Sequence, residues 1–333
     1  MSRDSQISLF DVTPEPKRSS VVGQATVDDE VRALAQKIPS AIRFGTSSWS
    51  FPGWEGIVYD RRETQSHLAK HGLRAYAKHP LLRAVGVDRT YYAPMTAEEL
   101  REYGDSVGDE FRFLVKAAGE VTNPYVRNAP GRYGKANASF LDAGFATDHV
   151  IGPTMEGLGA KAGPLVFQFP PVGRELTRDP ARFAGMLAAF LVELPSGPWY
   201  AVELRDHELL SGDYMGALES AGATHCVNVH PRMPSPREQA NVASGVNGEK
   251  LAIRWMLHSG LQYEEARDRY SPFDRLVDED SSTRSILADL AIETKRRGGE
   301  TVIVANNKAE GSAPLSLVKL AKEIVVRLAD DRG

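Results

Sequence analysis

The sequence predicts an α/β fold, a (β/α)8 barrel of the TIM type, formed by a single domain with a flexible amino-terminal tail. Short runs rich in β-branched and aromatic residues recur eight times along the chain. Amphipathic stretches with helical periodicity lie between these runs, as in AEELREYGDSV and SLVKLAKEIVVRLAD. The length of 333 residues suits one barrel around one core.

The eight predicted strands have nearly continuous apolar content, which suits strands covered on both faces of a parallel sheet. They are IRFGTSSW near Ile42, VGVDRTYY near Val87, FRFLVKA near Phe111, GPLVFQFPP near Leu165, YAVELRD near Ala201, THCVNVH near Thr224, KLAIRWMLH near Leu251 and TVIVANN near Val302. Eight strand–helix units close most economically as a barrel. The alternative is an open doubly wound sheet, but no strand is followed by the glycine fingerprint of a dinucleotide site.

The periodicity also predicts the domain boundaries. Residues 1–26 are polar, contain proline and have no sustained period, so we expect a disordered tail. The barrel unit is expected over residues 27–331 and opens with an amphipathic helix over 27–38. Two long segments, 123–162 and 231–249, are predicted to be βα loops over a ligand-binding face.

Composition limits the classes of function. A formal net charge of −4 gives no general attraction for polyanions, although local basic patches remain compatible with it. The sequence has no apolar run long enough to cross a bilayer and no apolar segment of a secretion signal near its start, so it predicts a cytoplasmic protein without membrane contact. Cys226 is the one cysteine, which excludes an internal disulfide, and its apolar neighbours predict an inert buried thiol.

Three charged residues are the predicted catalytic groups. Glu203 and Arg205 lie two positions apart on one strand, so both face the lumen of a barrel and need mutual compensation there. They form either a salt bridge that fills the barrel or a working pair, with Glu203 as acid or base and Arg205 holding an anion. Lys116 ends another strand, where it either positions an anion at the rim or acts as a base or Schiff-base former.

The predicted ligand-binding residues are polar or aromatic side chains near strand ends, where function gathers in parallel barrels. Trp49 offers a flat face for stacking, with core packing as the alternative. The amides of Asn306 and Asn307, assisted by Lys308, could hold a phosphate at the start of the last helix. The full set is Trp49, Tyr91, Gln168, Asn228, His230, Arg254, Asn306 and Asn307.

Histidines at strand ends raise the question of a metal. Strand parity groups Asn228 with His230 and Arg254 with His258, and such imidazoles could titrate near neutral pH or bind a metal ion. A metal centre of the kind found in barrel phosphodiesterases needs several acidic and histidine ligands. The available candidates are Asp88, Glu203, Asp206, His207 and His230. We therefore predict no cofactor and no tightly held metal, with a divalent ion as the less favoured alternative.

Taken in order, several stretches resemble the YecE-like family, domain of unknown function 72, a TIM-barrel family without an established activity. The resemblance covers residues 42–329 and rests on GTSSWSFPGWEG, DRTYYAP, FLVKA, LVFQFPP, VELR, IRW and ANNKAEGSAP. It implies that Trp49, Lys116, Gln168, Glu203, Arg205, Arg254 and Asn307 are shared positions. The sequence departs from the family pattern at Gly86, Asp88, Asn123 and Asp206, where the family favours an acidic residue, Asn, His and His.

A second resemblance lies in the tail. QISLF, residues 6–10, is similar to the short peptide by which bacterial replication and repair proteins dock on the sliding clamp. Such peptides use a glutamine at the edge of the pocket, here Gln6, and an apolar pair in its slot, here Leu9 and Phe10. Coincidence is the alternative, because pentapeptides are easily matched.

Three functions follow as hypotheses. The first is an enzyme or binder of nucleic acid or of a phosphorylated small molecule at the carboxyl-terminal barrel mouth, brought to DNA by the sliding clamp. The second is a hydrolase, lyase or isomerase acting on a sugar or sugar phosphate. The third is a non-catalytic adaptor in which the barrel is only a scaffold.

Overall fold

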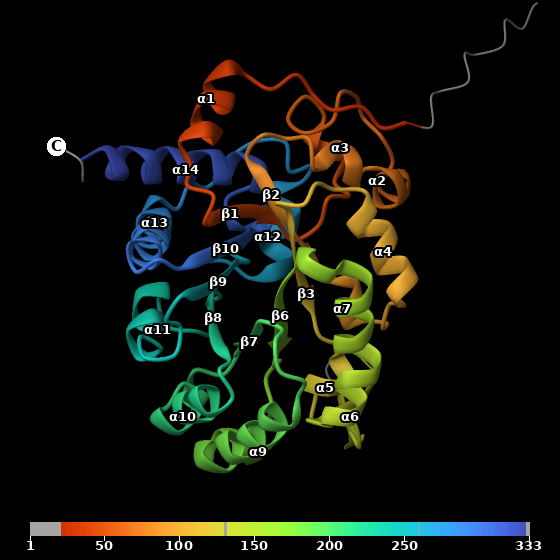
Figure 1. Ribbon diagram of the computed structural model, residues 1–333, viewed down its shortest axis with the longest axis vertical. Coiled ribbons are helices and arrows are strands. Elements are labelled where there is room, and N and C mark those ends of the chain that lie inside the picture. Colours follow the sequence, from red (N-terminus) through yellow and green to blue (C-terminus); the bar gives the residue numbers. More distant parts are fainter. Residues whose placement is uncertain (1–20, 130–131, 259, 331–333) are drawn as a thin grey trace, which may run out of the picture.

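The structure is a computed structural model that describes residues 21–129, 132–258 and 260–330, and it contains the predicted closed barrel (Figure 1). Eight parallel strands pair around a ring in the order β1-β10-β9-β8-β7-β6-β3-β2. The strands are β1 (Ile42–Thr46), β2 (Leu82–Val87), β3 (Arg112–Lys116), β6 (Ala162–Gln168), β7 (Tyr200–Glu203), β8 (Thr224–Val229), β9 (Lys250–Trp255) and β10 (Glu300–Ala305). Each predicted strand corresponds to one barrel strand, so the open-sheet alternative is wrong.

Helices surround the barrel and connect its strands (Figure 1). They are α1 (Asp29–Lys37), α2 (Gln65–His71), α3 (Leu73–Tyr76), α4 (Ala97–Asp105), α5 (Gly119–Thr122), α6 (Ala143–Ala146), α7 (Gly152–Leu158), α8 (Arg174–Thr177), α9 (Pro180–Glu193), α10 (Gly212–Ser220), α11 (Pro236–Val242), α12 (Tyr263–Tyr270), α13 (Ser281–Arg296) and α14 (Ala313–Asp330). A short antiparallel hairpin, β4 (Tyr125–Ala129) with β5 (Arg132–Ala136), stands outside the ring.

Local sequence signals set where several helices begin. Thr96 caps α4 through a capping box with Glu99, and Ser235 caps α11 in the same way with Glu238. Asp179 accepts a hydrogen bond from the backbone N–H of Arg182 at the start of α9. These caps satisfy backbone donors that have no partner within the helix.

Side chains alternate between the inside and the outside of the barrel. Val202, Ile253 and Ile303 belong to the large core between strands and helices. Their strand neighbours form a separate apolar cluster that fills the lumen: Ala84, Leu114, Val166, Trp199, Ala201, Cys226, Ala252, Val302 and Val304. Cys226 is fully buried there, and burial raises its pKa well above the usual thiol value, as expected of an inert thiol.

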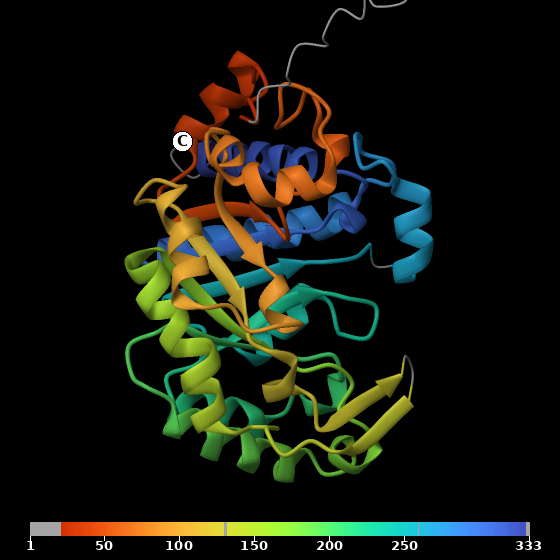
Figure 2. The same cartoon turned by 90° about the vertical axis from the view of Figure 1, so that its right-hand side faces the viewer.

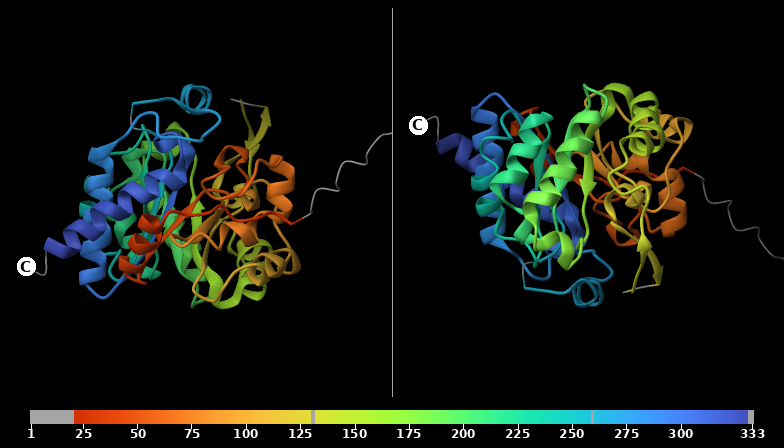
Figure 3. Two further views of the ribbon diagram at one scale, coloured as in Figure 1. Left: turned by 90° about the horizontal axis from the view of Figure 1, so that it is seen from above. Right: turned by 90° about the horizontal axis from the view of Figure 1, so that it is seen from below.

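The carboxyl ends of the strands point toward the side where the β4–β5 hairpin and α12 project (Figures 2 and 3). This side is the barrel mouth. Segment 123–162 was predicted as a loop but contains the hairpin at the mouth and α6 and α7, of which α7 packs against α4. Segment 231–249 likewise contains α11. The prediction was too coarse because both segments combine a loop with the helix that follows it.

The barrel unit begins before residue 27. Val22 and Ala25 are buried, and the backbone N–H of Ala25 donates to the carbonyl of Val58 at 2.9 Å. Residues 22–26, expected to be tail, therefore pack on the barrel, and the predicted helix follows as α1. The QISLF peptide lies outside the described residues. Among the helices that the structure describes, none combines the length and apolar character needed to span a membrane.

Candidate functional site

A group of charged side chains sits above the apolar cluster in the lumen. Lys116, Glu203 and Arg254 come two positions after Leu114, Ala201 and Ala252 on their strands, and therefore point inward in the next layer toward the mouth. The Arg254 guanidinium joins two carboxylates. Its Nη1 donates to Glu203 Oε2 at 2.6 Å, and its Nη2 donates to both oxygens of Asp88 at 2.9 and 3.1 Å.

Glu203 is the centre of this group. Its side chain is fully buried, and its second carboxylate oxygen is ion-paired with Arg205. Burial alone would raise the pKa of Glu203, but Arg205 and Arg254 outweigh burial and the pKa is lowered. The glutamate is therefore an anion that holds two arginines in place. A buried, ion-paired anion does not suit the acid role among the two predicted for Glu203, and the role as a base stays a prediction.

Lys116 lies in the same layer without a carboxylate contact. Its Nζ is 3.8 Å from the centroid of the Tyr91 ring, and within the described residues it makes no hydrogen bond or ion pair. Burial, followed by the charge of Arg254, lowers the pKa of Lys116 to about 8, against the opposing effect of Asp88 and Glu203. The amine is thus partly deprotonated slightly above neutral pH.

The cationic groups outnumber the anionic ones. Arg205 and Arg254 pair with the carboxylates of Asp88 and Glu203, and Lys116 adds a third basic group beside them; guanidinium groups stay charged in proteins. Arg205 Nη1 is buried without a hydrogen-bond partner in the described parts of the chain. A buried unpaired donor costs free energy unless a ligand or water satisfies it. The cluster of these five residues, called the charge cluster below, is therefore suited to an anion.

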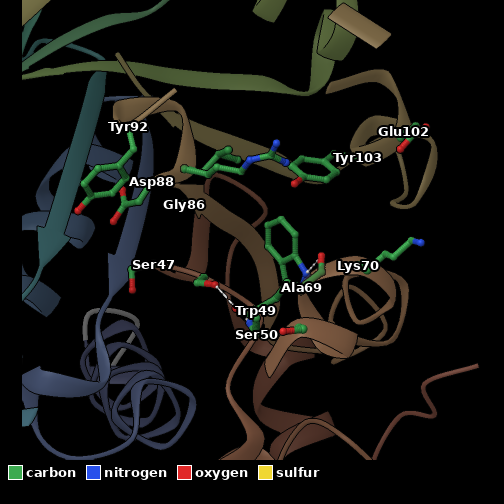
Figure 4. Close-up of a pocket in the computed structure, with 14 residues that line it drawn as sticks. Ser47, Trp49, Ser50, Ala69, Lys70, Gly86, Asp88, Tyr92, Glu102 and Tyr103 are labelled. Atoms are coloured by element: carbon green, nitrogen blue, oxygen red, sulfur yellow. Dashed lines mark hydrogen bonds between the residues drawn. The ribbon is translucent and has the colours of Figure 1, made fainter. Parts of the chain in front are cut away.

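Two cavities open beside the charge cluster. One of about 440 Å³ is lined by Ser47, Ser48 and Asp88 together with Trp49 and Tyr92. In Figure 4, Asp88 and Tyr92 lie at one side of this cavity, while Lys70 and Glu102 lie at the other. Its width suits a ligand that is larger than a bare anion.

The second cavity, of about 420 Å³, is lined by Tyr91, Tyr92, Asn123 and Tyr125. Asn123 Nδ2 donates to the Tyr91 hydroxyl at 3.0 Å, which orients the ring below Lys116. Tyr92 lines both cavities and is 79% exposed, an unusual position for a large aromatic side chain. Tyrosine faces of this kind can stack on a planar ligand.

The other polar residues predicted on β6 and β8 differ in their accessibility. Gln168 faces the lumen at the end of β6, paired in register with Glu203, and its amide makes no hydrogen bond within the described residues. Asn228 is fully buried and donates to the Leu204 carbonyl at 3.1 Å, where the β7–β8 ladder has opened. Asn228 thus contributes to the scaffold, and a ligand contact of the Gln168 amide stays a prediction.

His230 lies at the mouth but does not titrate near neutral pH, contrary to the expectation. Burial, and then the charge of Arg205, lowers its pKa to about 4, so the ring is neutral at pH 7. Its Nδ1 accepts the backbone N–H of Arg232 at 3.2 Å, which leaves Nε2 as the protonated nitrogen. His258 lies beyond the end of β9, so the alternation of side chains along the strand does not place it on the same face as Arg254.

The loop after β10 is covered rather than open. Asn307 Oδ1 accepts from the indole N–H of Trp54 and from the backbone N–H of Ala313 at the start of α14, and Asn307 is 1% exposed. The backbone N–H of Val277 donates to the carbonyl of Glu310 at 2.8 Å, which holds the chain around Val277 against this loop. Neighbouring groups thus occupy the carbonyl oxygen of the Asn307 amide, whereas Asn307 Nδ2 is buried without a hydrogen-bond partner among the described residues. A phosphate site at this helix start stays a prediction.

Asn306 remains closer to the lumen. Its Nδ2 donates to the Ser47 hydroxyl at 2.8 Å, and its Oδ1 accepts from Lys308 Nζ at 3.3 Å. Lys308 also lies 4.2 Å from the centroid of the Tyr263 ring. Both the nitrogen and the oxygen of the Asn306 amide are thus hydrogen-bonded within the protein. We infer that Asn306 orients the side chains of Ser47 and Lys308.

Trp49 lines the larger cavity but is 6% exposed. Its indole N–H donates to the Leu68 carbonyl at 3.0 Å, and its ring meets Tyr103 edge-on at 5.0 Å between centroids. The Trp49 side chain is therefore held in place by packing and also forms part of the cavity wall. Core packing and a ligand-facing position, the two alternatives for Trp49, are thus compatible.

The metal candidates are dispersed. Among the described residues, no group of three or more histidine, cysteine or acidic side chains could hold a metal ion. Asp206 accepts from the backbone N–H of Val172 at 2.8 Å and from Arg232 at 2.6 Å, and the His207 side chain is 63% exposed beside Glu208. The carboxylates of Asp88 and Glu203 are both ion-paired with Arg254.

Sequence reasoning missed Gln239. Its side chain is fully buried, donates to the backbone carbonyl of Asn228 at 2.7 Å and accepts its N–H at 3.1 Å. Gln239 thus replaces the missing β7–β8 pairing near the mouth. No sequence signal distinguishes it, because a glutamine in a polar helix ordinarily faces solvent.

These features define a TIM barrel with the charge cluster beneath its mouth. The chain belongs to a family described as "Protein of unknown function DUF72", whose model matches residues 43–330. This match confirms the resemblance found in the sequence.

Solved DUF72 structures share the fold. A DUF72 family protein from Thermotoga maritima is similar to this chain with a TM-score of 0.56 and 20% identity, covering 84% of this chain and 98% of its own. One from Enterococcus faecalis gives a TM-score of 0.54 and 16% identity, with coverage of 85% and 95%. No curated protein matches the sequence. At these identities the likeness concerns the fold alone.

Proposed function

We propose that the barrel mouth binds a phosphate-bearing ligand through the charge cluster. The proposal rests on one observation above all: among the described residues, Lys116 has no ionic partner and the buried Nη1 of Arg205 has no hydrogen-bond partner, and both groups lie beneath the mouth. A phosphate supplies several acceptor oxygens and negative charge, which satisfy Arg205 Nη1 and offset the positive charge around Lys116. Arg254 and Glu203 then act as positioning residues for these two groups.

The aromatic lining of the cavities favours a ligand that carries a planar or cyclic group beside its phosphate. Tyr91 and Tyr92 stand between the charge cluster and open space, so a ring attached to the phosphate can stack beside them. Nucleotides, flexible nucleic acid strands and sugar phosphates all combine these parts. The first hypothesis from the sequence is therefore the one that the geometry supports best.

The second hypothesis, a hydrolase, lyase or isomerase of a sugar or sugar phosphate with Glu203 as acid or base, is less well supported. A general acid needs a raised pKa and contact with the substrate. Glu203 has a lowered pKa and is fully buried between arginines. An adaptor role would predict that no small anion stabilises the barrel, so one experiment separates it from the proposal.

Inorganic phosphate is expected to raise the melting temperature of the wild-type protein by several degrees, because a ligand that binds only the folded state stabilises it. The Arg205→Gln variant should lose this phosphate-dependent shift. The matched control is Arg43→Gln, which removes an arginine paired with Glu300 at the opposite end of the barrel. Differential scanning fluorimetry with sodium phosphate, against sodium chloride at equal ionic strength, gives the shifts.

An unchanged phosphate-dependent shift in Arg205→Gln would contradict the proposed site. Equal loss of the shift in Arg43→Gln would show that any lost arginine abolishes it. No shift in the wild-type protein would favour the adaptor hypothesis.

Recruitment to DNA by the tail is a separate proposal that rests on the QISLF sequence. A purified bacterial sliding clamp should bind the full-length protein, and the Leu9→Ala, Phe10→Ala variant should bind at least about tenfold more weakly, because the apolar slot loses both anchors. Surface plasmon resonance on immobilised clamp gives the two affinities. Equal affinities, or no binding by either protein, would remove the recruitment hypothesis.

A further inference from the structure

The surroundings of Lys116 differ from those of other partly buried lysines. Lys161 Nζ donates to the Gly104 and Val107 carbonyls at 2.8 and 2.9 Å, and Lys308 Nζ bonds to Asn306. Lys116 is 8% exposed, yet its Nζ has no such acceptor within the described residues. A lysine that served only to stabilise the fold would gain from an acceptor or a carboxylate partner.

The neighbours of this amine favour its neutral, nucleophilic form. Burial removes water from the ammonium, and Arg254 and Arg205 repel its charge, which outweighs the attraction of the two carboxylates in the charge cluster. Desolvation combined with adjacent cations is a recognised way to activate a lysine for covalent chemistry with carbonyl groups. No hydrogen bond from the part of the chain that the structure describes engages the lone pair that the neutral amine would carry.

We infer that Lys116 forms an imine with the carbonyl carbon of a phosphate-bearing aldehyde held at the barrel mouth. This inference rests on the proposed phosphate site and adds the reactive group of the ligand. The neutral amine attacks the carbonyl carbon and forms the C–N bond. The nitrogen loses its two protons, the carbonyl oxygen gains two and leaves as water, and a C=N bond remains.

The arrangement places the parts of such a ligand in order. Its phosphate meets the unpaired Nη1 of Arg205, its carbonyl reaches Lys116, and the rest of the molecule extends past Tyr91 into the cavity with Tyr92 and Tyr125. The lowered pKa of Glu203 keeps it anionic, so it stabilises a protonated imine in the same lumen.

Pyridoxal 5′-phosphate and pyridoxal form a matched pair of probes, because they carry the same aldehyde and differ by the phosphate. Each is mixed with the protein near pH 8, reduced with sodium borohydride, and located by peptide mass mapping. Lys116 should be labelled at least about tenfold faster by the phosphorylated probe than by pyridoxal, reflecting about 1.4 kcal/mol per factor of ten in binding. Inorganic phosphate should suppress the difference.

Two lysines serve as internal controls. Lys308 is also buried but bonded to Asn306, and Lys250 is exposed beside the Trp199 ring at 5.8 Å, at the other end of the barrel. Both should react more slowly than Lys116, with no preference for the phosphorylated probe at Lys250. The Lys116→Met variant should lose the fast adduct and keep the slow ones.

The outcomes separate this inference from the proposed function. A phosphate-dependent rise in melting temperature without preferential labelling of Lys116 would overturn the imine and leave the phosphate site standing. Equal labelling of Lys116 by both probes would overturn the phosphorylated class of ligand. If neither effect appears, both proposals are wrong.

A second set of reactions identifies the source of the aldehyde. Borohydride is added to the protein with a panel of aldose phosphates, or with an oligonucleotide that contains an aldehydic abasic site. A Lys116 adduct with one set and not the other assigns a small molecule or a nucleic acid strand. No adduct with either would overturn the assignment of a phosphorylated aldehyde as the natural ligand.

Discussion

Replacing Glu203 by glutamine is expected to lower the free energy of unfolding by about 3–5 kcal/mol, the usual cost of removing one partner from a buried ion-paired group. Glu203 is fully buried and contacts both Arg205 and Arg254. The amide keeps the shape of the side chain but leaves two guanidinium charges with less compensation. Chemical denaturation of the wild type and variant by urea, followed by circular dichroism, gives the difference.

The matched control for this substitution is Glu300→Gln. Glu300 pairs with Arg43 at 2.9 Å, but at the amino end of the barrel, and its side chain is 37% exposed. Because solvent reaches the Glu300 carboxylate, although Arg43 is buried, its removal should cost less than that of Glu203, on the order of 1 kcal/mol. A loss in Glu203→Gln no larger than that in Glu300→Gln would contradict the central role given to Glu203 in holding the arginines.

Replacing Lys116 by methionine should have the opposite effect and stabilise the protein by about 1–3 kcal/mol near pH 7, since one pKa unit corresponds to 1.36 kcal/mol. The pKa of Lys116 is about 8 in the folded protein, against about 10.4 in an unfolded chain. Removing this cation leaves two arginines facing two carboxylates. Methionine has a similar length, but it loses the contact of the ammonium with the Tyr91 ring.

The sign of the pH dependence follows from the same values. Below about pH 8, Lys116 is protonated in both the folded and the unfolded protein, so the folded protein bears the full free-energy cost of the buried ammonium. Between about pH 8 and 10.4 the unfolded chain binds more protons, so the stability of the wild type rises with pH by this contribution. The advantage of Lys116→Met should therefore shrink toward pH 10.

Urea titrations at pH 7 and at pH 9.5 measure this change. Lys70→Met is the control, because Lys70 is exposed and lines the larger cavity, and its effect should stay within about 0.5 kcal/mol at both pH values. A destabilised Lys116→Met variant, or an advantage that does not change with pH, would show that Lys116 stabilises the fold.

The barrel could be predicted from the sequence because its strands are nearly continuous apolar runs. YAVELRD shows why this works: Val202 faces the helices and Glu203 the lumen, as period two requires. The predicted start of the barrel unit was less accurate. Val22 and Ala25 pack on the barrel although nothing in their polar surroundings has a period.

The site could be predicted only in part. Strand parity predicted that Glu203 faces the lumen together with Arg205, and the structure pairs these two side chains there. Parity fails beyond the strands, where Asn307 turns toward Trp54 and the start of α14.

The sequence also could not show that Arg254 bridges Asp88 and Glu203, because β2, β7 and β9 lie far apart in the chain. Contacts between distant strand ends depend on closure of the barrel. For the same reason the cavities beside Tyr92 could not be found from spacing.

The most direct test of the phosphate site is a crystal structure of the full-length protein soaked with pyridoxal 5′-phosphate. We expect a phosphate within hydrogen-bond distance of Arg205, and continuous density between the ligand and Lys116 Nζ. A phosphate bound elsewhere, with the mouth around Arg205 empty, would contradict it.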